Sequence, residues 1–209
     1  MKVITAADKH YMFMAENLAK SCKRHYDVII NKLDDMVDHS RFIKECHYKI
    51  DFIEEAINKY NEDIAWIDAD CLLLNKLCNP LSGCDVGVTL RRKGLMDLYF
   101  TYSGLLNAGV IFFHNCNNTK KFLKLWRAEL PNGKWRTDQE ALNVVTGVKR
   151  RNKPGNILYN GDIKIRILSC DEYNFFYFPE AVDKDKVKVL HFKGDTRKYY
   201  NEYAKALVG

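Results

Sequence analysis

The sequence contains few of the residues that interrupt a compact fold. Only four prolines and eleven glycines occur among its 209 residues. They are dispersed, which excludes a flexible linker or a low-complexity segment, and the sequence shows no internal repeat. With 47% apolar and 29% charged residues, the chain has the composition of an ordinary globular protein. We therefore expect residues 1–209 to form a single domain.

Long apolar runs are also missing. No stretch approaches the roughly eighteen consecutive apolar residues that a membrane-spanning helix requires. The opening residues, MKVITAADKHYMFM, contain an apolar stretch that is too short for a secretory leader and is interrupted by Asp8. These absences predict a cytoplasmic protein without a membrane span.

Cysteines at metal-binding or redox spacing are absent. The seven cysteines are an odd number, and no two of them form a C-x-x-C pair. This pattern argues against a disulfide framework and against a cysteine-rich zinc site, and it favours a reducing compartment.

Basic residues outnumber acidic ones by 33 to 27, which gives a net charge of +6. An excess of this sign favours an anionic partner such as a nucleotide, a nucleic acid or a lipid headgroup. The basic residues are spread along the chain, however, and the densest group, VKRRNKPG at 148–155, is typical of a solvated loop ending in a Pro-Gly turn. We therefore expect no nucleic-acid partner.

Apolar residues alternate between strand-like and helix-like spacing along the chain. Strands are predicted at 2–7, 26–33, 63–68, 84–90, 108–115, 162–168 and 187–192. Helices are predicted at 11–22, 48–60, 118–130, from 137 onward and at 199–209. Strands that alternate with helices indicate an α/β fold with a mixed, mostly parallel sheet flanked by helices. Ligands of such folds gather beyond the carboxyl ends of the strands.

One strand runs directly into two carboxylates, in the sequence DIAWIDADCLLL at 63–74. Asp68 and Asp70 are two positions apart, so in an extended chain their side chains point the same way. At a separation of ~5 Å and an effective dielectric constant near ~20 they would repel by roughly 3 kcal/mol. A bound cation, a bend in the chain or a shared proton would each relieve that cost.

A cation site at this edge could include an imidazole. His191 ends a late predicted strand and Asp8 follows the first one, so both could reach the edge that carries Asp68 and Asp70. Two carboxylates and one imidazole suit Mn²⁺ or Mg²⁺. The alternative is structural, because aspartates often cap turns at strand ends and a histidine can serve there simply to satisfy hydrogen bonds.

Two further segments allow both a structural and a functional interpretation. In TDQEALN, Thr137 and Glu140 are spaced as a capping box, and Asp138 suits the first helical turn. Neither interpretation excludes Asp138 from the edge of the sheet. In LLNAGVIFF, Asn107 and Gly109 could shape a turn before a buried strand or could form part of a site.

Together these segments resemble a known family. The four patches are DAD, NAGV, TDQEALN and HFKG, in that order, preceded by TAAD near the start. Their combination resembles the GT-A glycosyltransferases, and glycosyltransferase family eight in particular, over residues 3 to about 198. The resemblance implies a Rossmann-like nucleotide-diphospho-sugar transferase fold. Compact members without a membrane anchor occur in bacteria and in large algal DNA viruses, which implies the bacterial or the host cytoplasm.

The resemblance also implies roles for individual residues. Asp68, Asp70 and His191 would hold Mn²⁺ or Mg²⁺. Asp138 and Gln139 would hold the hydroxyls of the donor sugar beside its anomeric carbon. The remaining donor contacts, to the nucleotide, the sugar or the diphosphate, would be Asp8, Lys49, Asp68, Asn107, Ala108, Gly194 and Arg197 or Lys198. The last pair stays open because the family ending H-x-x-G-x-x-K-P-W is replaced here by HFKGDTRKYY.

The activity implied is metal-dependent transfer of a hexose-like sugar from a UDP-sugar to a glycan, a glycoprotein or another hydroxyl acceptor, with a retaining outcome. Three other functions stay open from the residues alone. A nucleotidyltransferase would need a glycine-rich opening loop, which VITAADKHYM lacks. A metal-dependent phosphohydrolase would need more metal ligands than this pattern supplies. A non-catalytic anion-binding domain would use DAD only as a cap.

Overall fold

The computed structural model of the chain describes residues 1–33, 41–92, 104–130 and 137–209, without the side chains of 41–47. Its described helices are α1 Met12–Cys22, α2 Arg41–Tyr60, α4 Asn117–Glu129, α5 Asp138–Thr146, α6 Cys170–Tyr173 and α7 Tyr200–Val208, with a 3₁₀ turn η1 at Gly194–Tyr199. Its described strands are β1 Lys2–Ala7, β2 Val28–Lys32, β3 Ile64–Ile67, β4 Cys71–Leu73, β5 Val86–Leu90, β6 Leu106–Phe113, β7 Ile157–Asn160, β8 Ile163–Ser169 and β9 Val189–His191. Each predicted strand and helix has a counterpart among these elements.

Seven strands form one central sheet in the order β2-β1-β3-β6-β5-β8-β7. The pairings β1–β2, β1–β3 and β5–β8 are parallel, whereas β3–β6, β5–β6 and β7–β8 are antiparallel. Tracing these directions across the sheet, β1, β2, β3, β5 and β8 point one way and β6 and β7 point the other way. The predicted α/β fold with a mixed, mostly parallel sheet is confirmed.

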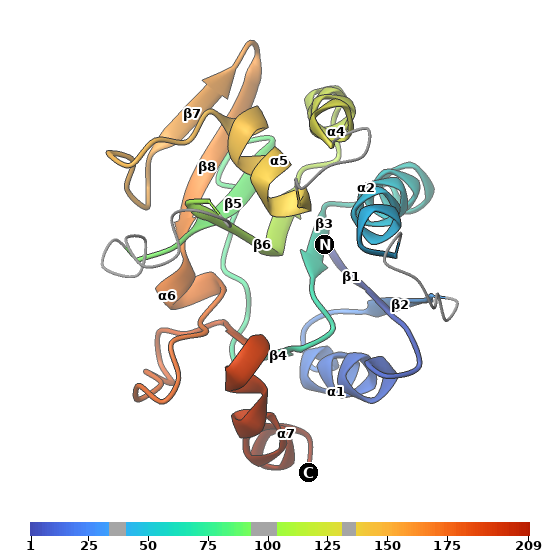
Figure 1. Cartoon of the computed structure of the whole chain (residues 1–209), viewed down its shortest axis with the longest axis vertical. Coiled ribbons are helices and arrows are strands. Elements are labelled where there is room, and N and C mark those ends of the chain that lie inside the picture. The colour runs from blue at the N-terminus through green and yellow to red at the C-terminus, as the bar shows by residue number, and fades with distance from the viewer. Residues whose placement is uncertain (34–40, 93–103, 131–136) are drawn as a thin grey trace.

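Apolar side chains cover both faces of this sheet. In β6, Ile111 and Phe113 pack into the cluster formed with α2, α4 and α5, whereas Val110 and Phe112 pack into the cluster that includes α1 and β4. This alternation follows from the two-residue period of a strand. It explains why the strands are apolar on both sides, as expected for a sheet covered by helices. In Figure 1, α2, α4 and α5 lie above α1 and α7.

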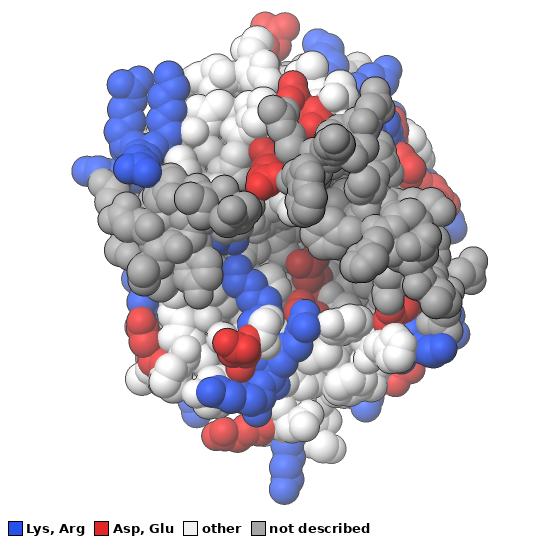
Figure 2. Space-filling view, viewed as in Figure 1, with Lys and Arg blue, Asp and Glu red and all other residues white. Residues whose placement is uncertain are grey.

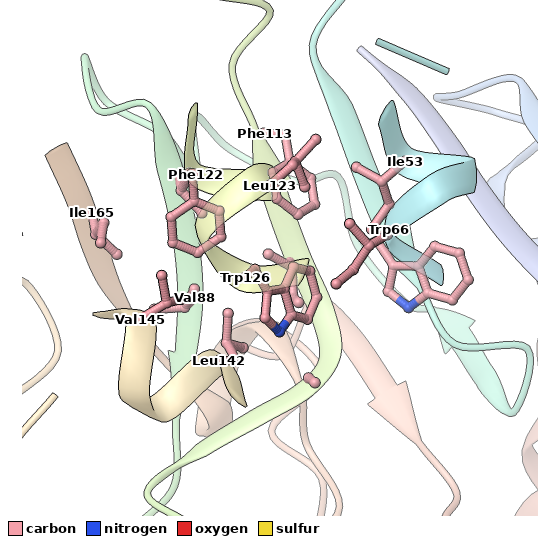
Figure 3. Packing of buried hydrophobic residues seen from close by; sticks show 14 of the residues in the cluster. Ile53, Trp66, Val88, Phe113, Phe122, Leu123, Trp126, Leu142, Val145 and Ile165 are labelled. Carbon is pink, nitrogen blue, oxygen red and sulfur yellow. The ribbon is translucent and has the colours of Figure 1, made fainter. Parts of the chain in front are cut away.

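The larger cluster fixes α4 and α5 against the sheet. Phe122 and Trp126 of α4 meet Leu142 of α5 beside Val88 of β5 (Figure 3). The Trp126 indole N–H also donates a hydrogen bond of 2.8 Å to the carbonyl oxygen of Asp138. Because Asp138 is the first residue of α5, this bond anchors the start of that helix.

A second, two-stranded sheet pairs β4 with β9. The late strand predicted at 187–192 thus exists, but its partner β4 follows directly after Asp70 and was not distinguished from the preceding strand by sequence. The antiparallel register places Cys71 opposite His191. This pairing brings His191 beside Asp70 although the two residues are far apart in the chain.

Within the described residues, none of the helices combines the length and the apolar character needed to cross a bilayer. The six described cysteines are all free thiols: Cys22, Cys71, Cys78, Cys84, Cys116 and Cys170.

Candidate functional site

The chain bends at the two carboxylates that follow β3. The backbone N–H of Cys71 donates to the carbonyl oxygen of Asp68 at 3.1 Å, closing a turn over Asp68–Cys71. The Asp70 side chain is 9% exposed, whereas the Asp68 side chain is 30% exposed. Each carboxylate has a cationic neighbour, Lys49 beside Asp68 and Arg197 beside Asp70.

His191 faces the two carboxylates. Its Nε2 lies 3.2 Å from Oδ1 of Asp70 and 3.9 Å from Oδ2 of Asp68. On the other side the ring lies against the backbone of Gly109, where an added Cβ would be 2.3 Å from Cε1 of His191. Only glycine leaves room for the imidazole at this position, which gives the glycine of NAGV a steric role.

The second oxygen of Asp70 binds Arg197. Nη2 and Nε of Arg197 lie 3.0 and 3.3 Å from Oδ2 of Asp70. Burial alone would raise the pKa of Asp70, but His191 and Arg197 together outweigh burial and lower that pKa below its ordinary value. The Asp70 carboxylate is therefore ionised at neutral pH.

Lys49 links the carboxylates of Asp138 and Asp68. Its Nζ lies 2.5 Å from Oδ2 of Asp138 and 3.4 Å from Oδ1 of Asp68, and 5.0 Å from the centre of the Trp66 ring. The Trp66 indole N–H donates to the same Asp68 oxygen at 2.7 Å. Lys49 also donates to the Ala108 carbonyl oxygen at 3.4 Å, so one side chain connects α2, β3, β6 and α5.

The start of α5 is held as the sequence predicted. Thr137 and Glu140 form both hydrogen bonds of the capping box. Gln139 accepts hydrogen bonds through Oε1 from the Ala108 N–H at 3.3 Å and from Nη2 of Arg91 at 3.0 Å. Sequence reasoning missed Arg91, although its position immediately after a predicted strand that ends at 90 is a signal for this edge.

Asp8 and Asn107 both serve their local backbone. Asp8 Oδ1 accepts from the N–H groups of His10 and Tyr11 at 2.9 and 3.1 Å. Asn107 Oδ1 accepts from the Gly109 N–H at 2.8 Å. The register between β5 and β6 shifts here: Val88 pairs with Ile111, but the next residue, Thr89, pairs with Asn107. NAGV therefore interrupts the β5–β6 ladder, leaving Ala108, Gly109 and Val110 without partners in β5.

A cavity of about 420 Å³ lies at this edge of the sheet. It is lined by Ala6, Ala7, Asp8, Tyr11, Leu33, Tyr48, Lys49, Trp66, Asp68, Ala69, Asp70, Asp138 and Arg197. Figure 2 shows acidic atoms recessed at the centre of this face, with basic side chains along the lower margin of the hollow. The cavity has the size of a small-molecule site and combines apolar walls with convergent charges.

The structure thus gathers six of the predicted site residues around one cavity: Asp8, Lys49, Asp68, Asp70, Asp138 and Arg197. His191 and Ala108 contact members of this group, as described above. Gln139 bonds to Ala108, and Asn107 lies two residues from Gly109, which touches the His191 ring. Gly194 and Lys198 are exposed and do not line the cavity. Of the two candidates for the late phosphate contact, Arg197 therefore faces the cavity.

The donor atoms suit a hard or borderline cation. Nε2 of His191 lies 3.2 Å from an Asp70 oxygen and 3.9 Å from an Asp68 oxygen, and an imidazole with carboxylates is a ligand set that Mn²⁺ or Mg²⁺ accepts. The thiol of Cys71 lies within 4.8 Å of the ligand atoms of Asp70 and His191. Burial raises the pKa of that thiol well above its ordinary value.

The family model for nucleotide-diphospho-sugar transferases matches residues 3–200. The chain belongs to this family. The match extends over the sheet and the whole cavity lining of this nucleotide-diphospho-sugar transferase. It confirms the resemblance at the level of this broader family, while the assignment to glycosyltransferase family eight stays a prediction. No curated protein sequence matches the chain.

Solved structures confirm the GT-A-type fold of this transferase. A glycosyltransferase involved in the glycosylation of the major capsid of PBCV-1 is 15% identical, with a TM-score of 0.64 over 97% of this chain and 100% of that one. The WbbM bifunctional glycosyltransferase is 14% identical, with a TM-score of 0.63 over 100% of this chain and 50% of that one. GlyE of Streptococcus pneumoniae TIGR4 is 15% identical, with a TM-score of 0.56 over 99% and 62%.

Proposed function

We propose that this transferase is a metal-dependent glycosyltransferase that moves a hexose-like sugar from a UDP-sugar to a hydroxyl group of a glycan or glycoprotein acceptor. The observation that carries the proposal is the meeting of Asp68, Asp70 and His191 beside a cavity that Arg197 and Asp138 also line. Family membership supplies the nucleotide-sugar donor.

Asp68, Asp70 and His191 would hold Mn²⁺ or Mg²⁺ at the edge of the sheet. When bound, such an ion neutralises charge that develops on a leaving diphosphate. Arg197 supports the same task, since its guanidinium reaches Asp70 from the cavity wall and can donate to phosphate oxygens. These groups account for the cost of placing two carboxylates so close together.

Asp138 and Gln139 would hold the donor sugar. Lys49 fixes the Asp138 carboxylate at 2.5 Å, and Gln139 is fixed by Ala108 and Arg91. Groups held in this way keep their orientation without the substrate, which is the condition for electrostatic stabilisation of positive charge at the anomeric carbon. Asp8 and Tyr11 line the other part of the cavity, where we place the nucleotide base.

A retaining outcome fits the carboxylates of the cavity better than an inverting one. An inverting transferase needs a general base opposite the leaving group. Among the described lining residues, Asp8 caps a turn, Asp68 and Asp70 face His191, and Asp138 is bound to Lys49. Each of these carboxylates already has another task. Proton NMR of the product should show the donor's anomeric configuration, and the opposite configuration would end this part of the proposal.

The proposal is tested by nucleotide-sugar hydrolysis and by thermal unfolding. We expect slow hydrolysis of a UDP-sugar that requires Mn²⁺ and stops with EDTA. UDP at 100 times its Kd should add about 2.7 kcal/mol of stability when Mn²⁺ is present, a rise in Tm of roughly 5–10 °C for a domain of this size. UDP should give no such shift in EDTA.

Asp70→Asn keeps the shape of the side chain and should lose the Mn²⁺-dependent shift. Asp51→Asn is the matched control. Asp51 lies on α2, is exposed and pairs with Arg127 of α4, so its variant should keep the shift. Protection by UDP that is equal in EDTA, or equal in Asp70→Asn, would contradict a metal-dependent donor site.

A further inference from the structure

A chain of buried hydrogen bonds runs from His191 away from the cavity. His191 Nδ1 lies 2.8 Å from Oδ1 of Asn174, and Nδ2 of Asn174 lies 3.0 Å from Oγ1 of Thr89. The Thr89 hydroxyl in turn donates to the carbonyl oxygen of Asn107 at 2.9 Å. Asn174 and Thr89 are both fully buried. Neither residue was predicted as part of the site, and neither lines the cavity.

The chemistry of these groups fixes the direction of every bond in the chain. A backbone carbonyl only accepts hydrogen bonds, so the single hydroxyl proton of Thr89 points at Asn107. The Thr89 oxygen must then accept from Asn174, and only the amide NH₂ can donate. The amide oxygen of Asn174 therefore faces His191. Because that oxygen only accepts, Nδ1 of His191 must carry a proton.

We propose that Thr89 and Asn174 are positioning residues that keep Nδ1 of His191 protonated, so that Nε2 is the ring nitrogen left to bind a cation. Without a cation, Nε2 lies 3.2 Å from the Asp70 carboxylate, which can only accept a hydrogen bond, so a bound cation takes the place of the Nε2 proton. The functional consequence rests on the proposed metal site, since a neutral imidazole binds a cation through its unprotonated nitrogen. The reverse amide orientation would take the Thr89 proton away from the Asn107 carbonyl and would present an N–H group to Nδ1. That arrangement selects the other tautomer, whose Nε2–H cannot bind a cation.

Steric contacts restrict the ring in the same arrangement. The Gly109 backbone lies against Cε1 and Nδ1 of His191, and the Phe176 ring lies edge-on with its centre 6.4 Å from that of the imidazole. A rotated imidazole would lose the Asn174 bond without gaining space. The outer partners of metal-binding histidines act in this way in general, and their removal typically lowers metal affinity 10- to 100-fold.

The tautomer can be measured without relying on catalysis. Long-range ¹H–¹⁵N NMR of the full chain should show Nδ1 of His191 protonated both in the metal-free protein and with Mg²⁺. Thr89→Val is nearly isosteric and should produce a mixture of both tautomers. Thr146→Val is the matched control, because Thr146 is also buried and donates to a carbonyl, that of Asn143 in α5. It should leave the His191 spectrum unchanged.

Mn²⁺ affinity, measured by EPR, gives the second readout. Asn174→Leu should raise the Kd for Mn²⁺ by 10- to 100-fold, and Asn174→Asp, which keeps an acceptor for Nδ1, should restore part of that loss. If Asn174→Leu fails to fold, Thr89→Val should still show a smaller increase in Kd. An unprotonated Nδ1 in the wild-type protein, or unchanged Mn²⁺ affinity in the folded variants, overturns the inference. Absence of Mn²⁺ binding by the wild type would instead refute the proposed function, because the tautomer is read independently.

Discussion

Nζ of Lys49 lies 2.5 Å from Oδ2 of Asp138, although 89 positions separate the two residues. Lys49 belongs to α2 and Asp138 is the first residue of α5, so their ion pair joins two helices across the edge of the sheet. Both side chains are largely buried, at 13% and 16% exposure. Removing the cation leaves the Asp138 carboxylate in a poorly solvated position, which is costlier than losing a surface ion pair.

Lys49→Met tests this link, since it keeps the aliphatic stem and removes the charge. We expect the free energy of unfolding to fall by about 1.5–3 kcal/mol, the usual range for a hydrogen bond to a charged group. The rate of UDP-sugar hydrolysis should also fall, because the Asp138 carboxylate loses the partner that orients it. Lys59→Met is the control in the same helix: Lys59 is exposed and should change stability by less than about 0.5 kcal/mol. Equal stability of the two variants in urea unfolding would show that the pair has no structural role.

Arg197 has two competing partners in the proposed site. It binds Asp70 through two nitrogens, and we propose that it also donates to the diphosphate. Arg197→Gln should therefore weaken UDP binding in Mn²⁺ by about 10- to 100-fold, which corresponds to the loss of a charged hydrogen bond. Binding of Mn²⁺ alone should be as tight as before or tighter, because Asp70 no longer shares an oxygen with a cation.

Isothermal titration calorimetry separates these two effects. Lys198→Gln is the matched control, because Lys198 follows Arg197 in η1 but does not line the cavity. It should change neither affinity substantially. Weaker binding of Mn²⁺ itself by Arg197→Gln would mean that the guanidinium supports the geometry of Asp70 rather than competing for it.

The buried cysteines should be chemically inert in the folded protein. Burial raises the pKa of the Cys22 and Cys170 thiols to about 12, so almost no thiolate exists at pH 8, and the thiolate is the reactive form. Cys78 is exposed. With a disulfide reagent at pH 8, peptide mapping by mass spectrometry should find rapid labelling of Cys78 and none of Cys22 or Cys170 until the chain is unfolded in urea. Prompt labelling of either buried thiol would contradict this packing.

Periodicity predicted the main sheet and its helices because long apolar segments carry a clear signal. It did not separate β4 from β3, since the apolar run resumes after Asp70 and β4 has only three residues. The pairing of β4 with β9 is long-range, and no local pattern indicates it. The prediction that His191 reaches Asp70 therefore depended on the resemblance and on strand ends sharing an edge, and the structure supplies the ladder that causes it.

From the residue pattern alone, the candidate site was predictable only where a polar residue interrupts an apolar pattern at a strand end, whereas Lys49, Asp138 and Arg197 followed from the family resemblance. Asp68, Asp70 and His191 meet that condition. Thr89 does not, because threonine is ordinary in a strand, and its role becomes visible only when its hydroxyl is seen beside Asn107 and Asn174. Likewise, nothing local in the sequence marks Lys49 as the partner of two carboxylates.

Gly109→Ala tests the steric condition at the centre of the site. The new Cβ would lie 2.3 Å from Cε1 and 2.7 Å from Nδ1 of His191, so the imidazole must move away from Asp70. We expect Mn²⁺-dependent protection by UDP to be lost even where the variant remains folded. The control is Gly161→Ala, at which an added Cβ meets no atom within 4 Å.

The two glycine variants should affect different properties: Gly161→Ala the stability of the fold, and Gly109→Ala the protection by UDP and Mn²⁺. Gly161 has φ +58°, so its replacement costs about 1–2 kcal/mol of backbone strain and should lower Tm without changing the shift that UDP and Mn²⁺ produce. Gly109→Ala should also reduce the rise in Tm that UDP and Mn²⁺ produce. This reduction should be larger than expected from the lower Tm of the metal-free variant. If both variants lose stability and both keep the full shift, contact between the Gly109 backbone and His191 is not required for the cation site, and the geometry proposed for the three ligands must be abandoned.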